Sequence, residues 1–254
     1  QSLAAGIGHT CAFTHAGQAY CWGRGDNGRR LTGDSADFAT VSAPTLIGLD
    51  VGVSEGAVGH FVAGQNTCWL VGTTVRCAGN NSWGQCTGDN SAVGNQFEVV
   101  SPATDMTLLA AGDNFVCGYG SGGVRCWGQA DSGRTGGTVT ASGGQRTPAP
   151  RLIVGTENAI DLVAKGDTAC ILTSSGEVKC WGACSYGRCG NESWLPQYQA
   201  RTVSGLPPVV KLRMGGSTTC AEDAKGQLWC WGNGEYGQLG DGLTGSNHMS
   251  GVPK

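Results

Sequence analysis

Short apolar runs bounded by glycine recur along the whole chain, and they predict β-strands rather than helices. One kind is rich in small residues and ends in glycine; it occurs at residues 2–6, 61–64, 108–112, 161–166 and 210–216. A second kind is flanked by proline, as in the segments that begin at Ala43 and Ala149. No run approaches the ~20 apolar residues of a membrane-spanning helix, so membrane insertion is not expected.

A pair of cysteines nine or ten positions apart follows each small-residue run. The pairs are Cys11 with Cys21, Cys68 with Cys77, Cys117 with Cys126, Cys170 with Cys180, and Cys220 with Cys230. In four of the five copies the second cysteine is followed by Trp-Gly. Since glycine stands near the middle of each pair, each copy predicts a β-hairpin with a tight turn.

The turn chemistry agrees with the cysteine spacing. Pairs ten apart imply three-residue loops with glycine third, at residues 15–17, 174–176 and 224–226. Pairs nine apart imply two-residue loops, Gly72-Thr73 and Ser121-Gly122, with glycine available for positive φ. In such hairpins the two cysteines face each other as a non-hydrogen-bonded pair, whose Cα atoms approach to about 4.5–5.5 Å. We therefore predict five hairpin disulfides; buried thiols or zinc ligands fit this spacing less well.

The repeating unit is larger than a hairpin. The second cysteines, at positions 21, 77, 126, 180 and 230, are about 50 residues apart, which leaves room for four short strands per unit. Such units predict an all-β fold, a β-propeller of four-stranded blades, in a single domain spanning 1–254. The approximate units are 1–50, 51–105, 106–158, 159–208 and 209–254. Two arrangements stay open: a closed five-bladed ring, or an arc of a larger ring completed by another chain.

Tryptophan occupies a fixed place in four units. We expect Trp22, Trp127, Trp181 and Trp231 to pack between adjacent blades, because a fixed position in every unit argues for packing rather than ligand stacking. The second unit has Ala78 at this position, and Trp69 in the facing strand is expected to compensate.

The stretch QLWCWGNGEYGQLGDG, residues 227–242, resembles the repeat of the regulator of chromosome condensation family. The wider group includes a secreted bacterial β-lactamase-inhibitor propeller and the extracellular repeats of crinkly-type plant receptor kinases, whose hairpins also carry cysteine pairs. The resemblance implies a β-propeller, usually of seven blades, whereas five units are counted here. The nuclear exchange-factor role of the founding member is not carried over, because a disulfide-dense acidic chain does not suit a nuclear protein.

The composition indicates the cellular compartment and the class of partner. Thirteen cysteines in regular pairs indicate an oxidising location, so the protein is expected to be secreted, displayed on the cell surface or periplasmic. The net charge of −3 provides no basic footprint of the kind that nucleic acid requires. We expect no nucleic-acid partner and no cofactor.

Three cysteines lie outside the hairpins. Cys184 and Cys189 are expected to form a small disulfide that stiffens the loop of the fourth unit. Cys86 has no mate; it is either a free thiol or an intermolecular link. Asn80 and Asn191 stand in acceptor patterns for N-glycosylation, which matter only if the host glycosylates secreted proteins.

The loops after the hairpins carry the candidate binding residues. An aromatic residue, a glycine and then glutamine or arginine recur there. The candidates are Trp83, Gln85, Tyr186, Arg188, Tyr236, Gln238, the equivalently placed Arg29 and Arg134, and Trp194 in an insertion of the fourth unit. Two interpretations remain: a recognition face for a protein or glycan, or packing of each loop against the next blade.

No motif for catalysis is apparent, and His9, His15, His60 and His248 share no repeat position. Asp113 and Asp167 are equivalent and are interpreted as solvated turn carboxylates rather than cation ligands. The tripeptide at residues 24–26 matches an adhesion motif, which chance explains better. We therefore expect a non-catalytic binding module that recognises a protein or glycan. The alternatives are a self-associating structural subunit of an extracellular assembly, and an enzyme or enzyme inhibitor.

Overall fold

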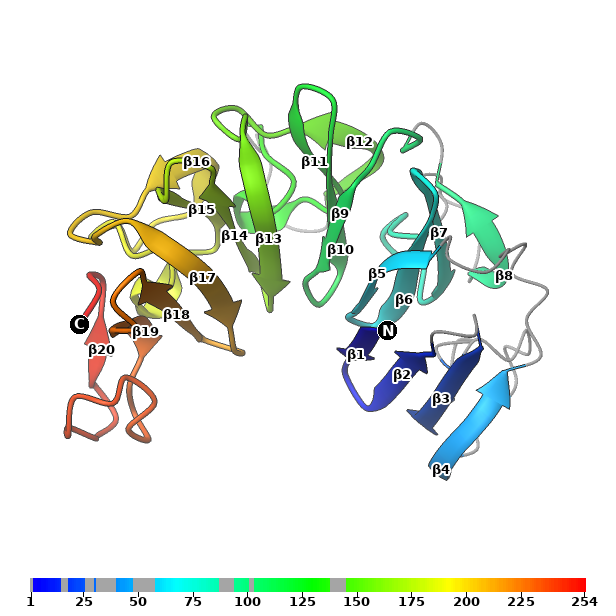
Figure 1. Ribbon diagram of the computed structural model, residues 1–254, viewed down its shortest axis with the longest axis horizontal. Coiled ribbons are helices and arrows are strands. Elements are labelled where there is room, and N and C mark those ends of the chain that lie inside the picture. The colour runs from blue at the N-terminus through cyan, green and yellow to red at the C-terminus, as the bar shows by residue number, and fades with distance from the viewer. Residues whose placement is uncertain are drawn as a thin grey trace.

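The computed structural model describes residues 2–14, 18–25, 30, 40–47, 58–86, 94–100, 103–137 and 145–254. Over these residues the chain forms five four-stranded sheets, in each of which the strands follow chain order and pair antiparallel. The sheets stand side by side in an arc around a common axis (Figure 1). The prediction of an all-β propeller fold is confirmed.

Each sheet lies within one of the predicted units. The first contains β1 (Ser2–Ala5), β2 (His9–Phe13), β3 (Ala19–Arg24) and β4 (Thr40–Ile47), and the second contains β5 (Val58–Ala63), β6 (Asn66–Val71), β7 (Thr74–Gly79) and β8 (Gly94–Val99). The third contains β9 (Leu108–Ala111), β10 (Phe115–Gly120), β11 (Gly123–Gln129) and β12 (Arg146–Leu152). The fourth contains β13 (Ala159–Lys165), β14 (Thr168–Thr173), β15 (Val178–Gly182) and β16 (Gln197–Thr202). The fifth contains β17 (Val209–Met214), β18 (Thr218–Asp223), β19 (Leu228–Asn233) and the short β20 (Met249–Ser250).

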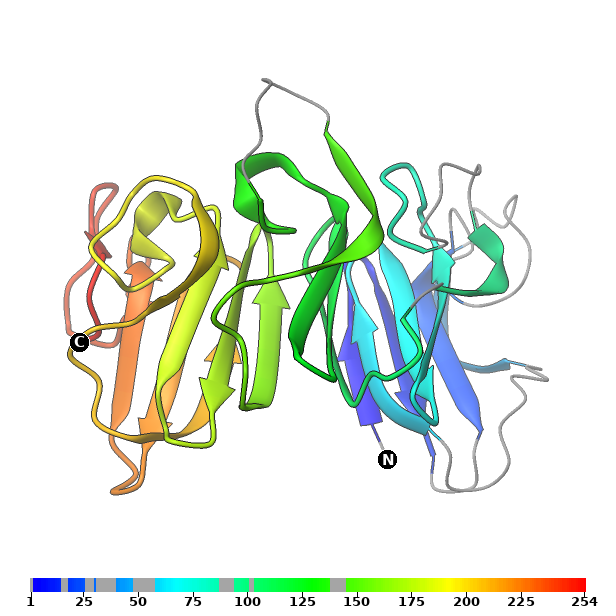
Figure 2. The same ribbon diagram turned by 90° about the horizontal axis from the view of Figure 1, so that it is seen from above.

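The first strand of each sheet lines the axis, and neighbouring first strands contact one another (Figures 1 and 2). The glycine that follows each of these strands permits a close approach of backbones: the Ile7 N–H donates to the Gly64 carbonyl at 3.0 Å, and the Asp113 N–H donates to the Gly166 carbonyl at 2.9 Å. Small residues occupy these strand ends because a larger side chain would push adjacent blades apart.

The hairpins and their disulfides form as predicted. Each cysteine faces its partner in the register, with Cα atoms 4.1–4.2 Å apart in all five hairpins. Gly176 and Gly226 adopt φ of 81° and 78° at the third position of their loops, and Gly72 and Gly122 adopt φ of 61° and 83° in the two-residue loops. The loop at residues 15–17 lies outside the described residues. Cys184 and Cys189 form the sixth disulfide.

The recurring Trp-Gly step coincides with an irregularity between the third and fourth strands of the first, third and fourth sheets. The register between β15 and β16 shifts between Cys180 and Gly182, so Trp181 has no partner in β16. Gly182 has φ of 100°, and a Cβ there would collide with the backbone of Asp167. Glycine is therefore required next to tryptophan so that the strand can bulge.

The hydrophobic core consists of clusters between adjacent sheets, and tryptophan belongs to each described cluster. Trp127 packs with residues of the second blade, Trp181 with the third and Trp231 with the fourth, and all three are fully buried. Packing between blades is thus confirmed for these three residues. In the second blade Ala78 and Trp69 are both fully buried.

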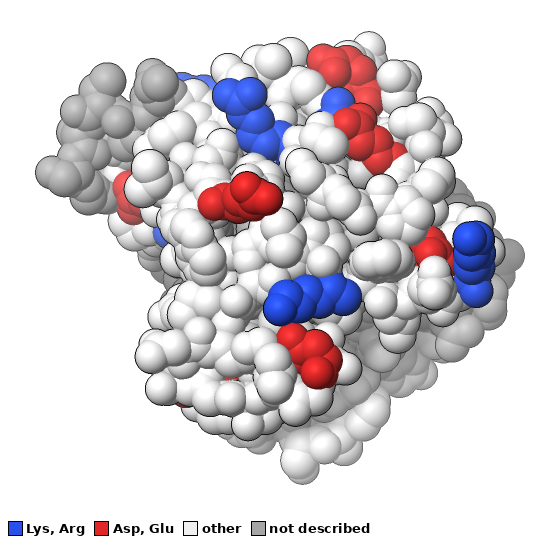
Figure 3. Space-filling view, turned by 90° about the vertical axis from the view of Figure 1, so that its left-hand side faces the viewer, with Lys and Arg blue, Asp and Glu red and all other residues white. Residues whose placement is uncertain are grey.

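The described sheets form an open arc, so the alternative of a closed five-bladed ring is wrong. Figure 1 shows the first and fifth sheets at opposite ends with a gap between them. Packing at each junction sets the angle between neighbouring sheets, and five sheets at these angles do not complete a turn. Figure 3 views the end formed by the fifth blade, where separated charged side chains lie on a largely uncharged surface.

Candidate binding face

The loops that follow the third strands of the third, fourth and fifth sheets lie on one face of the arc. The 3₁₀ turns η2 (Asp131–Gly133) and η3 (Ser185–Gly187) belong to these loops in the third and fourth blades. Figure 2 shows them on one side of the sheets, with the tip of the β18–β19 hairpin on the other. The sequence-predicted candidates in the described residues all belong to this loop face.

In the second, third and fourth blades a backbone carbonyl of this loop accepts a hydrogen bond from the next blade. The indole Nε1–H of Trp127 donates to the Gln85 carbonyl at 3.0 Å. Trp181 donates to the Arg134 carbonyl at 3.1 Å, and Trp231 donates to the Arg188 carbonyl at 2.9 Å. The glutamine or arginine of the loop motif is therefore part of the junction between blades.

The side chains at these positions differ in exposure. Gln85 is fully buried and its Oε1 accepts the Trp83 N–H at 2.8 Å. Arg134 is 7% exposed, and its Nη2 lies 3.3 Å from Asp167 Oδ1 of the next blade. For these two residues the structure favours the interpretation of packing against the next blade. Arg29 lies outside the described residues.

Among the described residues, the exposed aromatic side chains lie on the fourth and fifth blades. Tyr236 is 79% exposed, Tyr186 46% and Trp194 49%. Trp83 is half-buried, and the Arg146 guanidinium lies 5.9 Å from its ring centroid. A ring of equivalent aromatic groups around the whole face is therefore not formed; the exposed aromatic surface is local.

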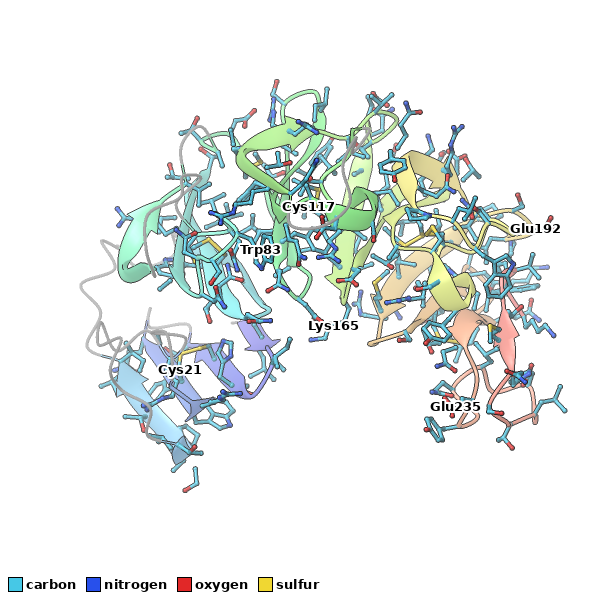
Figure 4. The ribbon with its side chains drawn as sticks, turned by 180° about the vertical axis from the view of Figure 1, so that it is seen from behind. Cys21, Trp83, Cys117, Lys165, Glu192 and Glu235 are labelled. Carbon is cyan, nitrogen blue, oxygen red and sulfur yellow. A yellow bond between two sulfur atoms is a disulfide. The ribbon has the colours of Figure 1, made fainter. Side chains whose placement is uncertain are left out.

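The insertion of the fourth blade is held by covalent and hydrogen bonds. The Cys184–Cys189 disulfide closes the loop around η3, and the Arg188 Nη2 donates to Ser185 Oγ at 2.7 Å. Farther along, the Glu192 N–H donates to the Gly251 carbonyl of the fifth blade at 3.0 Å. Figure 4 places Glu192 on the outer rim of the arc.

Trp194 and Leu195 are presented to solvent by this anchored segment. Leu195 is 73% exposed. The neighbouring polar groups bond to one another, since Gln197 Nε2 donates to Ser193 Oγ at 2.8 Å and to the Leu195 carbonyl at 3.1 Å. We call residues 191–197 the Trp194 loop. Sequence reasoning found Trp194 but missed Leu195, because nothing in the local pattern shows that this leucine is uncovered.

The hollow along the axis differs from the loop face because its lining is mainly aliphatic. It encloses about 290 Å³ and is lined mainly by alanine, leucine and valine from the inner strands. Lys165 points into it (Figure 4), and Arg213, also at its wall, pairs with Asp161 at 3.3 Å. Its described lining contains no carboxylate, histidine or thiol, so these residues provide no acid–base pair for an enzyme.

The remaining titratable side chains considered as site candidates make hydrogen bonds within the fold. His9 Nε2 lies 2.7 Å from Thr67 Oγ1 across the first junction, and His248 Nε2 lies 3.1 Å from Asp241. Burial acts to raise the pKa of Asp241, but the Leu243 N–H and His248 outweigh it and lower that pKa below its usual value. No group of three potential metal ligands occurs in the described part of the chain. His15, the side chain of His60 and Asp26 of the adhesion tripeptide lie outside it.

Cys86 is a fully buried thiol, and its Sγ lies 3.4 Å from the Asn80 carbonyl oxygen. Of the two alternatives for Cys86, a free thiol or an intermolecular link, this burial favours the first, because a buried thiol is not accessible to a second chain. Asn80 is also engaged: its Nδ2 donates to Gln65 Oε1 at 3.0 Å. Asn191 Oδ1 accepts the Ser193 N–H at 3.2 Å. No helix in the described ranges is long and apolar enough to cross a membrane.

Comparison with known proteins also indicates a β-propeller fold. Residues 159–188 and 209–238 match one sequence model of the regulator of chromosome condensation (RCC1) repeat, and residues 225–254 match a second. Human WBSCR16 is 21% identical over 100% of this chain and 65% of its own, with a TM-score of 0.80. Prp20p from Saccharomyces cerevisiae is 16% identical over 100% of this chain and 62% of its own, with a TM-score of 0.84.

An extracellular protein is also similar. The ectodomain of the Physcomitrella patens receptor kinase CR4 is 19% identical over 97% of this chain and 56% of its own, with a TM-score of 0.56. The chain therefore spans less than two thirds of each of these three proteins. Its fold is that of an RCC1-like β-propeller. Its fourth and fifth blades carry the RCC1 repeat itself.

Proposed function

We propose that this protein is a non-catalytic module, located outside the cytoplasm, that binds a protein partner through the Trp194 loop. The observation that carries the proposal is the pair of exposed side chains, Trp194 and Leu195, on a segment anchored to the fifth blade at Gly251. A loop already held in place loses little entropy on binding, and exposed tryptophan is a frequent energetic centre of protein interfaces.

A protein partner is favoured over a glycan by the chemistry of the loop. Glycan recognition needs polar groups beside the aromatic ring to bind sugar hydroxyls. Here Ser193 and Gln197 bond to each other and to the loop backbone. The side chain beside Trp194 is the apolar Leu195, which suits an apolar patch on a protein.

The relatives support a binding role without naming the partner. The structure of Prp20p is reported with its binding to Gsp1p and histones, and yeast RCC1 is known in complex with Kap60. Those partners belong to those proteins. Six disulfides support a location in an oxidising compartment for this chain. The similar receptor-kinase ectodomain is an extracellular domain, which is consistent with such a location.

The test compares three forms of the protein in a crosslinking pull-down from the extracellular fraction of the source. Wild type and Leu228→Ala, which removes an equally exposed side chain from the β18–β19 hairpin, should retain the same protein. Trp194→Ala/Leu195→Ala should lose about tenfold or more of that signal, because truncating a binding hot spot costs about 2 kcal/mol or more.

Two results would contradict the proposal. Equal recovery by the double variant would remove the Trp194 loop from the interface. Binding of wild type to a glycan array, lost in the double variant and with no protein recovered, would favour the glycan alternative.

A further inference from the structure

A second hollow lies between the fourth and fifth blades, on the side of the arc opposite the loop face. It encloses about 580 Å³. One wall is the linker 205–208, which joins β16 to β17, and the other is the β18–β19 hairpin, whose tip can be followed in Figure 2. A hollow of about 300–1,000 Å³ is the usual size of a pocket for a small organic molecule.

The hollow belongs to an internal junction of the arc. Trp229, which lines it, is paired in register with Ala221, so the two side chains lie on the same face of the fifth sheet. Ala221 belongs to the core cluster between the fourth and fifth blades. Trp229 therefore points toward the fourth blade, and both walls of the hollow are built from described residues.

The residue before the second cysteine of each hairpin has a different partner in each of the last three blades. In the third blade it is Arg125, whose Nη1 lies 3.2 Å from Asp105 Oδ1, so an ion pair joins the hairpin to the preceding linker. In the fourth blade it is Lys179, whose Nζ lies 3.4 Å from Glu177 Oε2 of the same hairpin. In the fifth blade it is Trp229.

Tryptophan at this position leaves the space between hairpin and linker open. The Trp229 indole N–H donates to Asp223 Oδ2 of its own hairpin at 3.3 Å. The facing linker carries Leu206, Pro207 and Pro208 in place of an acidic residue. Since no ion pair crosses between these two described walls, the hollow has an apolar lining of one indole ring, one leucine and two prolines.

Both walls are held in place without a ligand. The Val209 N–H at the end of the linker donates to the Gly176 carbonyl of the fourth blade at 2.9 Å, and Leu206 packs against the core cluster. The hairpin is closed by the disulfide between Cys220 and Cys230. A pocket formed in advance loses little entropy when a ligand enters it.

The polar groups of the hollow indicate the charge of its ligand. Asp223 is buried and its carboxylate already accepts three N–H groups, those of the Lys225 and Gln227 backbones and the Trp229 indole. The side chains of Lys225 and Gln227 are exposed and make no hydrogen bond to another described residue. An ammonium and an amide are thus available at the rim, and both can donate to an anion.

We infer that this hollow binds a small aromatic carboxylate. The aromatic ring lies against Trp229 and the prolines, and the carboxylate pairs with Lys225 Nζ and accepts a hydrogen bond from Gln227 Nε2. Stacking on an aromatic ring adds about 0.5–1.5 kcal/mol to the burial of the ligand ring. A proline-rich peptide fits less well, because such peptides dock in extended grooves lined by aromatic side chains and this hollow has one.

The inference does not rest on the Trp194 loop. That loop lies on the other face, so loss of binding at one place leaves the other intact.

The experiment titrates two matched probes into ¹⁵N-labelled protein. Indole-3-acetate has the ring and the charge, whereas indole-3-acetamide has the ring alone. Indole-3-acetate should shift the indole N–H signal of Trp229 saturably and bind about three- to fivefold more tightly than the amide, as expected for an exposed ion pair. Trp229→Phe, which removes that signal, identifies it, and sequential assignment of wild type provides the same information if the variant does not fold.

Two lysine variants test the role of the charge. Lys225→Gln, an exposed turn substitution, should bind indole-3-acetate as weakly as wild type binds indole-3-acetamide and should leave the affinity for the amide unchanged. Lys211→Gln makes the same change in the same blade, at a residue outside the lining of the hollow, and should behave as wild type.

Three results would overturn the inference. The first is no saturable shift of the Trp229 signal at about 10 mM probe, a concentration that would reveal even millimolar binding. The second is equal affinity for the two probes, or an affinity for the acetate that Lys225→Gln leaves unchanged, because the carboxylate would then make no contact. The third is a shift caused by a proline-rich peptide and by neither probe, which would assign the hollow to a peptide.

Discussion

At the scale of single residues, the loop motif acts through its backbone. Gln85, Arg134 and Arg188 differ in side chain and exposure, yet each offers its carbonyl to the tryptophan of the next blade. Every residue has a backbone carbonyl, so this hydrogen bond does not depend on the side chain. The glutamine or arginine position of the loop motif can therefore vary between blades, and its recurrence does not require that these side chains bind a ligand.

The hydrogen bond of Trp181 gives a direct prediction. Trp181→Phe should lower the free energy of unfolding by about 1–3 kcal/mol, because the Arg134 carbonyl is left buried without a donor. Trp194→Phe makes the same chemical change on an exposed ring and should stay within about 0.5 kcal/mol of wild type. Urea denaturation of the three proteins checks this, and equal midpoints would contradict it.

At the scale of elements, the three-residue hairpin loops share a side-chain acceptor before the turn. Thr14 Oγ1 accepts the Gln18 N–H at 3.1 Å, and Thr173 Oγ1 accepts the Glu177 N–H at 3.1 Å. Asp223 Oδ1 takes the same place in the fifth blade, where it accepts the N–H groups of Lys225 and Gln227 at 2.8 and 3.0 Å. In the fourth and fifth hairpins the turn is therefore stabilised by three features at once: the disulfide, the left-handed glycine and this acceptor.

Asp223 makes the fifth hairpin sensitive to acid. Burial acts to raise the pKa of Asp223, but the N–H groups of Gln227 and Lys225 and the Trp229 indole outweigh it and lower that pKa below its usual 3.8. Because the folded pKa lies below the unfolded one, the stabilisation is complete above the unfolded value and is lost as pH falls toward the folded value.

We expect Asp223→Asn to be less stable than wild type near about pH 6, and this difference to disappear toward about pH 2. Ser204→Ala, an exposed substitution that removes no carboxylate, serves as the control and should keep the same difference from wild type at every pH. Urea titrations at several pH values measure both. A gap between Asp223→Asn and wild type that is constant with pH would show that the carboxylate charge does not contribute.

At the scale of the whole molecule, the disulfides carry a large share of the stability. Each hairpin bridge closes a loop of about ten residues, worth about 2–3 kcal/mol in the chain-entropy account. Five such bridges sum to about 10–15 kcal/mol, which is as large as the whole net stability of a typical domain. The cores between blades contain many small residues, so the bridges make up for limited apolar burial.

Reduction should therefore unfold the protein. With dithiothreitol in mild urea we expect loss of the β-sheet signal in circular dichroism under conditions where the oxidised protein stays folded. Alkylation followed by mass spectrometry provides the control: the oxidised chain should label once, at Cys86, and only after denaturation. A reduced chain that keeps its sheets would show that packing alone suffices.

Local features were readable from the sequence. The cysteine spacing, the parity of the loops and the place of each glycine determined the hairpins, and the hairpins determined the disulfides. The tryptophans after the second cysteines were assigned to the junctions because they recur at the same place in each unit. These features depend on residues within about ten positions of one another, and turn geometry restricts such short segments to a few conformations.

Only the tertiary structure decided the features that join distant segments. The opening of the arc, the burial of Gln85 and Cys86, and the docking of Glu192 on Gly251 each depend on how one blade packs against the next. The angle between sheets results from many small contacts, and no single residue in the sequence specifies it. The same pattern of aromatic, glycine and glutamine is half-buried at Trp83, where Arg146 of the third blade lies against the ring, and exposed at Tyr236. The sequence pattern is the same at both places, so only the packing of the next blade decides the exposure.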